Sequence, residues 1–322
     1  MDLEYDWHEG SPSAEVIQEA SRWLAAQVKE SPNDDVQVLP EVDYASLKAE
    51  QRNVFLQVMA YFKKLKKNDH EFLMPPPFHI NVDSTAGTGK SFLIWAISTA
   101  LREMFADELE GKDPVVRLAP TGISAFGIRG WTMNFGLSIP VKEGKEFQQL
   151  GDSALQQSQI RWRGVKLLIL DEKSMVGRAQ MGRADRQLWQ IFPTASEETL
   201  GGLPAIFFGD FAQLPPIGDT PLYSSKMSGG RRLGLALEGC RVFESFQQSI
   251  TLSCIFCQEG EDPEQIKFQD ALLRLRTYST SSDDYELFST RFWPNLTPEE
   301  HTQFNEVLHL LQTRAAVHEC NT

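Results

Sequence analysis

The sequence STAGTGKS, which runs from Ser84 to Ser91, constrains the fold of this 322-residue chain more than any other segment. It follows FHINVD (78–83), a largely apolar run typical of a buried strand, and it precedes a stretch that we expect to be helical from Lys90 onward. Strands of parallel α/β sheets lead into helices through tight turns of this kind. We therefore expect the turn to lie at the carboxyl edge of a parallel sheet.

Three further runs have the same apolar character: VVRLA (115–119), VKLLIL (165–170) and PAIFFG (204–209). Continuous apolar strands are buried on both faces, which requires helices on both sides of the sheet. The sequence therefore predicts an α/β fold with a doubly wound, mostly parallel sheet. A further strand is expected near residues 249–254, and helices are expected at about 262–276 and 283–291.

The glycines and the lysine of the first turn suit the binding of phosphate groups. Gly87 and Gly89 let the backbone turn and approach a ligand closely, so that successive N–H groups and the helix N-terminus face the phosphates. Lys90 is expected to reach the β- and γ-phosphates of ATP, and the Ser91 hydroxyl to ligate Mg²⁺. The alternative is a glycine-rich turn with a chance Lys-Ser pair, and Ser84 stands where the consensus GxxxxGK[ST] has its first glycine. The residues of this loop expected to bind the nucleotide are Ser84, Thr85, Ala86, Gly87, Thr88, Gly89, Lys90 and Ser91.

Two polar segments follow later strands at the same expected edge of the sheet. LLILDE ends in Asp171 and Glu172; Asp171 is expected to hold Mg²⁺, and Glu172 to take a proton from an attacking water. GDFAQLPPI (209–217) carries Gln213, which is expected to contact the γ-phosphate or that water. The alternatives are a solvated acidic turn for the first segment and an ordinary turn glutamine for the second.

Four motifs in this order closely resemble those of the petite-integration-frequency (Pif) family of superfamily-one DNA helicases. They are AGTGKS, APTG (119–122), DEKSM (171–175) and GDFAQLPPI, of which the last is the most specific. SLKAEQRNVF (46–55) also resembles the Q motif of that family, in which Gln51 would recognise adenine. The resemblance covers residues 44–322 and implies a RecA-like ATPase domain.

The resemblance implies ATP-driven unwinding of DNA, with five-prime to three-prime movement along a single strand. Single-stranded or forked DNA would be the partner, and the biological setting would be repair, recombination and telomere maintenance. The chain contains no apolar run of the roughly 18 residues that a membrane helix needs, and its first residues lack the features of a signal peptide. We expect an intracellular protein acting in the nucleus, with the mitochondrion as the alternative.

The same resemblance implies where DNA would bind. Thr121 and Gly122 would hold the DNA backbone, and Asn134 stands where the family often has a DNA-contacting histidine. Nearby aromatic residues could stack on a base or pack in the core, and core packing is the expectation we favour for all of them. These aromatic residues are Phe126, Trp131 and Phe135.

The domain organisation follows from charge and from the extent of the resemblance. The first 50 residues hold 12 acidic and 3 basic side chains, whereas the remainder holds 32 acidic and 28 basic ones. We therefore expect an acidic extension at 1–40 that contains one helix at 13–29, the first RecA-like domain at 41–305, and the start of a second RecA-like domain at 306–322. A motor of this type needs the whole second domain, because it moves by closing two domains around ATP.

Two departures from the family pattern bear on activity. Lys173 occupies the usually apolar position of DExSM, and Cys257 stands in SCIFCQ where the family has an arginine. An arginine that stabilises the transferring phosphoryl group can contribute a rate factor of about 10³ to 10⁵. The alternative function is therefore a nucleotide- and DNA-binding remnant without motor activity. Cys254 and Cys257 form a lone CxxC, which we expect to pack as small apolar residues on a strand.

Overall fold

The computed structural model describes residues 38–67, 75–85, 87–109, 111–140, 147–225, 233–254, 262–304, 310–311 and 313–321. Contacts divide the chain into two units, of which one spans Asp35–Glu261 and the other contains Asp262–Thr322. The helix expected at 13–29 lies outside the described residues. The domain borders expected at residues 40 and 305 stay predictions.

The larger unit is built on a single parallel sheet with the strand order β3-β2-β4-β5-β1-β6. The strands are β1 (His79–Ser84), β2 (Val115–Ala119), β3 (Trp131–Thr132), β4 (Leu167–Leu170), β5 (Ala205–Gly209) and β6 (Gln248–Leu252). Because all six strands run the same way, the segments that follow β1, β2, β4 and β5 emerge at one edge. This arrangement confirms the predicted α/β fold class.

Both faces of the sheet are buried, as the continuous apolar strands predict. In β4, Leu167 and Ile169 pack into one core cluster, whereas Leu168 and Leu170 pack into the cluster on the opposite face. Burying each such leucine or isoleucine contributes about 1.5–3 kcal/mol relative to leaving it exposed. The short strand β3 was not expected from the sequence, because two residues are too few to show a pattern.

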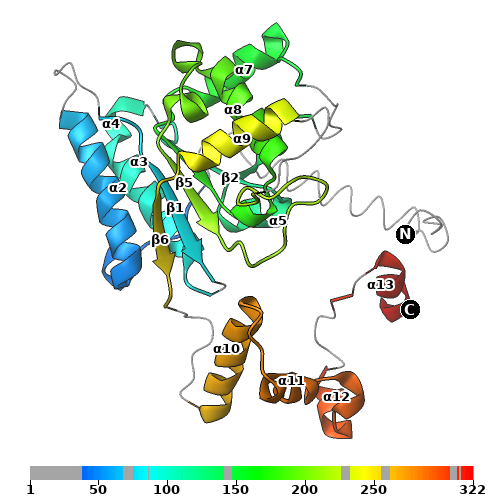
Figure 1. Ribbon diagram of the computed structural model, residues 1–322. Helices are drawn as coiled ribbons and strands as arrows, with labels where there is room; N and C mark the ends of the chain where they lie inside the picture. The colour runs from blue at the N-terminus through cyan, green and yellow to red at the C-terminus, as the bar shows by residue number, and fades with distance from the viewer. Residues whose placement is uncertain are drawn as a thin grey trace, which may run out of the picture. The chain divides into compact units, whose positions relative to one another are not determined.

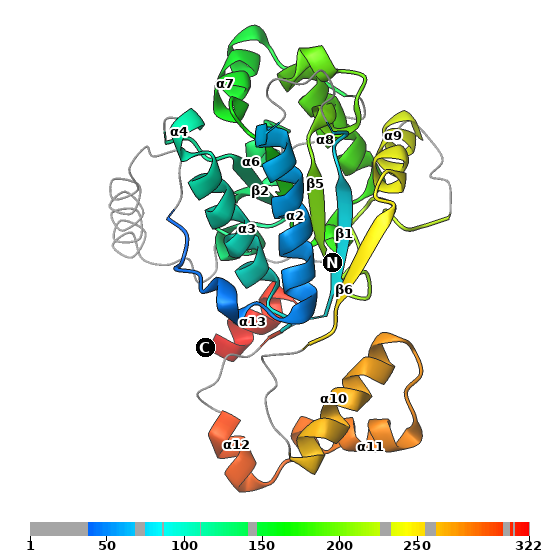
Figure 2. The same ribbon diagram turned by 90° about the vertical axis from the view of Figure 1, so that its left-hand side faces the viewer.

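Helices cover both faces of the sheet (Figures 1 and 2). The buried face of α3 repeats at helical spacing through Leu93, Ile97 and Leu101, and this face joins the same core cluster as α2. The helices α7 to α9 lie on the other side of the sheet. The helices of this unit are α2 (Ala49–Lys67), α3 (Lys90–Met104), α4 (Ala106–Leu109), α5 (Gly122–Gly127), α6 (Met133–Gly136), α7 (Asp152–Trp162), α8 (Arg178–Ile191) and α9 (Leu233–Glu244). Its 3₁₀ turns are η1 (Tyr44–Ser46), η2 (Lys173–Met175), η3 (Pro193–Ala195) and η4 (Thr199–Gly202).

Glycines let the backbones of α8 and α9 touch. A Cβ atom on Gly239 would lie 1.9 Å from the carbonyl oxygen of Arg178, and one on Gly182 would lie 2.0 Å from that of Leu235. Neither position can therefore hold a larger residue unless the two helices separate. The N-terminus of α8 is capped from a distant loop, since Asp219 accepts hydrogen bonds from the N–H groups of Ala179 (3.3 Å) and Gln180 (3.0 Å).

A buried carboxyl holds the turn η4 against α8. Asp185 is 4% exposed, and its Oδ1 accepts a hydrogen bond of 2.7 Å from the N–H of Leu200. Leu200 has a left-handed backbone with φ of 55°, which costs a residue other than glycine roughly 1–2 kcal/mol. Burial raises the pKa of Asp185 to about 6, and the hydrogen bond from Leu200 opposes part of that rise.

The smaller unit is helical in its described part. Its elements are α10 (Pro263–Arg276), α11 (Ser282–Ser289), η5 (Trp293–Asn295), α12 (Pro298–Phe304) and α13 (Arg314–Asn321). Arg274 holds α10 and α11 together through two hydrogen bonds of 2.8 and 2.6 Å to the Asp284 carboxylate. Ser281 and Asp284 form a capping box at the start of α11. The helices expected at 262–276 and 283–291 are therefore present.

Candidate functional site

The carboxyl edge of the sheet gathers the segments that the sequence marks out. β1 leads into the glycine-rich turn, β4 into Asp171, and β5 into the loop that carries Gln213. The strand order places β5 between β1 and β4, with β2 and Thr121 on the far side of β4. Segments separated by more than 100 residues thus meet at one edge, where open parallel sheets bind their ligands.

The glycine-rich turn adopts the conformation expected of a phosphate loop. Gly87 and Gly89 have φ values of 81° and 74°, a left-handed region that glycine adopts without strain. Thr88 is buried, and its Oγ1 donates a 3.0 Å hydrogen bond to the Thr85 carbonyl, which closes the turn. Ala86 lies outside the described residues.

Ser84, at the position of the first consensus glycine, ends β1 and pairs with Leu252 of β6. Its backbone is not left-handed, so the serine introduces no strain of the kind that would require glycine. Its Oγ is buried and has no hydrogen-bond partner among the described residues.

Lys90 and Glu172 face each other across this edge. Lys90 is the first residue of α3, and its Nζ lies 3.7 Å from Oε1 of Glu172. The two side chains are 13% and 23% exposed, so solvent and a ligand can reach them. A pair of opposite charges at a phosphate loop is suited to exchange, because phosphate oxygens can take the place of the carboxylate beside the ammonium.

Asp171 and Ser91 fit the predicted Mg²⁺ site. Asp171 is 5% exposed, and its Oδ1 accepts a 2.9 Å hydrogen bond from the N–H of Glu172. Burial raises the pKa of the Asp171 carboxyl, and the nearby Lys90 opposes that rise. The Ser91 hydroxyl makes no hydrogen bond within the described part of the chain. One carboxylate and one unengaged hydroxyl beside a phosphate loop match the few protein ligands that Mg²⁺ takes when phosphates supply the rest.

Glu172 itself has an unusual backbone. Its φ and ψ are 52° and 45°, the left-handed region, although it is not a glycine. This conformation costs roughly 1–2 kcal/mol and persists only where the surrounding structure holds it. Its neighbours Asp171 and Lys173 are both buried, so the residue is fixed on each side.

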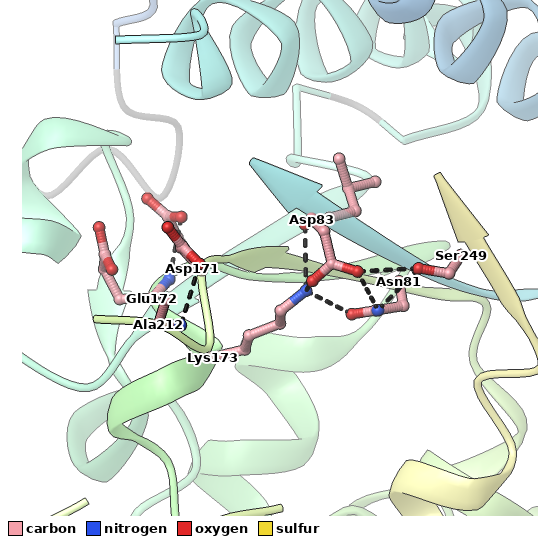
Figure 3. A network of polar contacts seen from close by, with 9 residues as sticks. Asn81, Asp83, Asp171, Glu172, Lys173, Ala212 and Ser249 are labelled. Carbon is pink, nitrogen blue, oxygen red and sulfur yellow. Dashed lines mark hydrogen bonds and ion pairs between the residues drawn. The ribbon is translucent and has the colours of Figure 1, made fainter. Parts of the chain in front are cut away.

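Lys173 is a buried cation within a network of polar side chains (Figure 3). Its Nζ donates to Oδ1 of Asn81 and Oδ1 of Asp83, at 2.5 Å in each case, and lies 4.8 Å from the centre of the Phe211 ring. Burial lowers the pKa of the Lys173 ammonium, and the Asp83 carboxylate opposes that fall. The Oγ of Ser249 on β6 donates a 2.9 Å hydrogen bond to the other oxygen of Asp83.

Sequence reasoning did not single out Asn81, Asp83 and Ser249. A signal was present, because Asn81 and Asp83 are polar residues two positions apart in a strand whose alternate residues, Ile80 and Val82, are apolar. Two positions apart on a strand means the same face, so both had to find polar partners in the interior. The lysine in the usually apolar position of DEKSM is that partner.

The side chain of Gln51 is buried and hydrogen-bonded through both its nitrogen and its oxygen, so it is not free to bind a base in this conformation. Its side chain is 3% exposed, and its Nε2 donates to the carbonyls of Thr88 at 3.0 Å and Gly89 at 3.4 Å. Its Oε1 accepts a 3.1 Å hydrogen bond from the N–H of Lys48. In this conformation Gln51 braces the phosphate loop from behind, and its part in adenine recognition stays a prediction.

Gln213 lies at the same edge but is exposed, on the loop after β5. Its backbone N–H donates to the carbonyl of Asp210 at 3.0 Å, and its side chain has no polar partner within the described residues. The structure therefore leaves the amide available at the site without bringing it into contact with Lys90 or Glu172.

The residues expected to contact DNA lie around α5 and α6. Thr121 caps α5 by accepting a 3.2 Å hydrogen bond from the N–H of Ser124, and Gly122 opens that helix. A Cβ on Gly122 would meet nothing within 4 Å, so packing does not require a glycine there. The Asn134 amide donates to the carbonyl of Ile139 at 3.3 Å and is half-buried.

Core packing was the wrong expectation for two of the three aromatic residues. Phe126 is 70% exposed and Phe135 is 57% exposed, whereas Trp131 is half-buried. Each exposed ring is paired with a guanidinium: Arg129 lies 4.8 Å from the centre of Phe126, and Arg161 lies 4.7 Å from that of Phe135. An exposed phenylalanine beside an arginine is a surface suited to stacking and to anions.

The expectation that the cysteines pack on a strand was wrong for Cys254. Cys254 is exposed and follows the end of β6 at Leu252, whereas Cys257 lies outside the described residues. Among the described residues, no group of three or more histidine, cysteine, aspartate or glutamate side chains could hold a metal ion together. None of the described helices is long and apolar enough to cross a membrane.

Comparison with known proteins places the chain in a family. A model of the PIF1-like helicase family matches residues 46–285. ATP-dependent DNA helicase PIF1 of Saccharomyces cerevisiae is 29% identical over 216 residues, which cover 66% of this chain and 22% of that protein. ATP-dependent DNA helicase Pif1 of Bdellovibrio bacteriovorus is 36% identical over 139 residues, covering 42% of this chain and 28% of that protein.

Solved structures share the fold. A crystal structure of Pif1 helicase from Candida albicans matches with a TM-score of 0.56 at 22% identity, covering 85% of this chain and 53% of the other. A Bacteroides Pif1 helicase in complex with ADP-AlF3 and ssDNA matches with a TM-score of 0.56 at 23% identity, covering 85% and 56%. The chain thus spans about half of these solved chains and less than a third of the curated relatives. Because the family model matches well over half of the chain, the chain belongs to the PIF1-like helicase family.

Proposed function

We propose that this chain is the ATPase unit of a DNA helicase, and that it forms the N-terminal half of a motor that couples ATP hydrolysis to five-prime to three-prime unwinding. The observation that carries this proposal is the meeting of Lys90 and Glu172, 3.7 Å apart, where the phosphate loop and the strand β4 reach one edge of the sheet. A phosphate-binding lysine and a carboxylate that can accept a proton are two of the groups that ATP-hydrolysing sites use.

In this proposal, each group at the edge has one role. The backbone N–H groups of residues 85–89 surround the phosphates, and Lys90 neutralises the β- and γ-phosphate oxygens. Ser91 and Asp171 hold Mg²⁺, which would supply charge neutralisation at the phosphates. Glu172 takes a proton from the attacking water, and Gln213 contacts the γ-phosphate or that water.

The ion pair between Lys90 and Glu172 links phosphate binding to the release of the base in this proposal. The ammonium of Lys90 and the carboxylate of Glu172 lie 3.7 Å apart. When a triphosphate enters, its oxygens compete for the ammonium, and the Glu172 carboxylate is released toward the position of the water.

DNA is the proposed second ligand, in single-stranded or forked form. Thr121, Gly122 and Asn134 would contact its backbone, and the open space at Gly122 favours a close approach. The exposed rings of Phe126 and Phe135 would stack on bases, each supported by an arginine. Such stacking contributes roughly 1–3 kcal/mol per base, so replacing one ring by alanine should weaken single-strand binding by about 5- to 150-fold.

The biological setting is proposed from the family. An intracellular role in DNA repair, recombination and telomere maintenance fits an ATP-dependent DNA helicase, with the nucleus as the first location and the mitochondrion as the alternative. Unwinding itself needs a second RecA-like domain, because two domains must close around the nucleotide to move along DNA.

A second candidate function is favoured by one residue. Cys257 stands where the family has an arginine, and a thiol cannot supply the positive charge that stabilises the transferring phosphoryl group. The chain would then bind nucleotide and DNA without motor activity.

Fluorescent-nucleotide binding and ATP turnover, with and without single-stranded DNA, test both candidates. We expect the chain to bind ATP, and Lys90→Ala to abolish binding or turnover while Lys63→Ala, at the exposed end of α2, changes neither. Turnover that DNA stimulates and Lys90→Ala removes supports the ATPase unit. Tight binding with turnover no higher than that of Lys90→Ala favours the second candidate, and a chain that binds no nucleotide refutes both.

A further inference from the structure

Lys173 has no exposed surface, although it follows Glu172 directly at the edge where the ligand would bind. It is the only lysine among the described residues with a fully buried side chain. Long cationic side chains reach solvent wherever they can, so a lysine with no exposure is held by specific partners. These partners lie on β1, the strand that carries the phosphate loop.

The contacts of Lys173 join two functional segments. Its Nζ lies 2.5 Å from Oδ1 of Asp83 and 3.2 Å from the carbonyl oxygen of Val82, and Asp83 directly precedes Ser84, the first residue of the phosphate loop. Asp83 is fixed in turn, because Ser249 of β6 donates to its other oxygen at 2.9 Å and Asn81 does so at 3.0 Å (Figure 3). The cation therefore reaches a carboxylate that is already held in place.

Glu172 lies between this anchor and β4. Its left-handed backbone, with φ of 52°, is unfavourable for a residue other than glycine and must be imposed by its neighbours. On one side, Asp171 continues β4 and accepts a hydrogen bond from the N–H of Glu172. On the other side, the Glu172 carbonyl accepts a 3.1 Å hydrogen bond from the N–H of Met175 in η2, and Lys173 anchors the turn through its side-chain bonds to β1.

We propose that Lys173 is a positioning residue: its salt bridge with Asp83 holds Glu172 in the left-handed conformation and so aims the Glu172 carboxylate at the phosphate site. The inference rests on the proposed function, in which Glu172 accepts a proton from water. It assigns to Lys173 an effect on the reaction rather than on nucleotide affinity, because Lys173 touches β1 and not the loop that surrounds the phosphates.

A purely stabilising role is the competing explanation. A buried ion pair can often be replaced by apolar residues of similar size without loss of stability, so stability alone gives no reason for a lysine here. A purely stabilising pair would also leave the reaction of the folded protein unchanged when it is removed. The two explanations therefore differ in what happens to the reaction in variants that remain folded.

The test measures the affinity of the 322-residue chain for ADP alone and for ADP with aluminium fluoride, a mimic of the transferring phosphate, and it also measures ATP turnover. Lys173→Met keeps the length of the side chain and removes its charge. We expect this variant to bind ADP within about threefold of the parent, and to lose about 10- to 100-fold in preference for ADP with aluminium fluoride and in turnover. The binding measurement gives a result even when turnover is slow.

Arg117→Met is the matched control. Arg117 is a second buried cation in the same sheet, 4% exposed, and it is paired with Asp113 at 2.8 Å away from the phosphate loop. Like Lys173→Met, Arg117→Met removes a buried cation from its carboxylate partner, so both variants should have a lower unfolding temperature. Arg117→Met should leave the preference for the mimic unchanged. An equal loss of preference in both variants would indicate general destabilisation and overturn the proposal.

A double variant that combines Lys173→Met with Glu172→Gln tests whether Lys173 acts through Glu172. If Lys173 acts through Glu172, adding Lys173→Met to Glu172→Gln causes no further loss of preference or turnover. Independent, multiplying losses would overturn the proposal, and so would an unaltered preference in Lys173→Met. If the parent chain binds ADP equally well with and without the mimic, Glu172 has no measurable effect in this assay and the inference is overturned. If the parent chain binds no ADP at all, the proposed function is refuted instead.

Discussion

Replacing Asp185 by asparagine should make the larger unit more stable at neutral pH. Asp185 is 4% exposed, and burial raises its pKa from 3.8 to about 6. An acid whose pKa is raised in the folded state contributes its stability below the unfolded value, and this contribution is lost as the pH rises through about 6. Above that pH the folded chain holds a buried carboxylate that would be better solvated in the unfolded state.

The magnitude follows from the two pKa values. A difference of about two units corresponds to about 3 kcal/mol between the acidic and neutral limits. About 1.4 kcal/mol of this falls between about pH 5 and pH 7.5. Asparagine keeps an oxygen for the 2.7 Å hydrogen bond from the N–H of Leu200 but cannot ionise, so Asp185→Asn should escape this loss.

Urea unfolding followed by tryptophan fluorescence at the two pH values measures the effect. We expect the difference in unfolding free energy between Asp185→Asn and the parent to grow by about 1–1.5 kcal/mol from about pH 5 to pH 7.5. Asp152→Asn, at the exposed start of α7, controls for the removal of one carboxylate. If the unfolding free energies of the parent and of Asp185→Asn change by the same amount between the two pH values, the reasoning is refuted.

Three further outcomes are expected. Asp219→Ala removes the cap of α8 and should cost about 1 kcal/mol in urea unfolding, whereas an unchanged midpoint would show that the cap is dispensable. Gly239→Ala should cost about 1–3 kcal/mol because its Cβ meets a carbonyl of α8 at 1.9 Å, while Gly234→Ala in the same helix meets nothing within 4 Å and should cost nothing. Gln51→Ala should lower the affinity for ATP and for inorganic tripolyphosphate by similar factors, because it removes the brace behind the phosphate loop. A loss confined to ATP would instead identify Gln51 as a reader of the base.

The sequence predicts those parts of the fold that depend on local pattern. VVRLA coincides with β2, and the apolar runs at 165–170 and 204–209 contain β4 and β5, because strands buried on both faces are recognisable from their composition. The helix α9 was not among the helices expected from the sequence. The strand order could not be predicted, because it depends on which distant strands pair.

The site divides in the same way. The glycine turn and the acidic pair are contiguous motifs, so their meeting at one edge follows from parallel strands alone. The partnership of Lys173 with Asp83 joins residues 90 positions apart, and only the fold brings them together. The exposure of Phe126 and Phe135 was likewise beyond sequence reasoning, because an aromatic residue in a short helix has no pattern that separates a surface position from a buried one.

The uniform direction of the six strands also determines where a label or a tether can be attached to the protein. The loops that enter β2 and β4 lie at the amino-terminal edge, opposite the phosphate loop, and Arg163 in the second of these is exposed. A dye or an immobilising tether attached there would stand a full strand length from the reacting groups. Single-molecule recording can therefore be built on that edge while the opposite edge keeps its access to nucleotide and solvent.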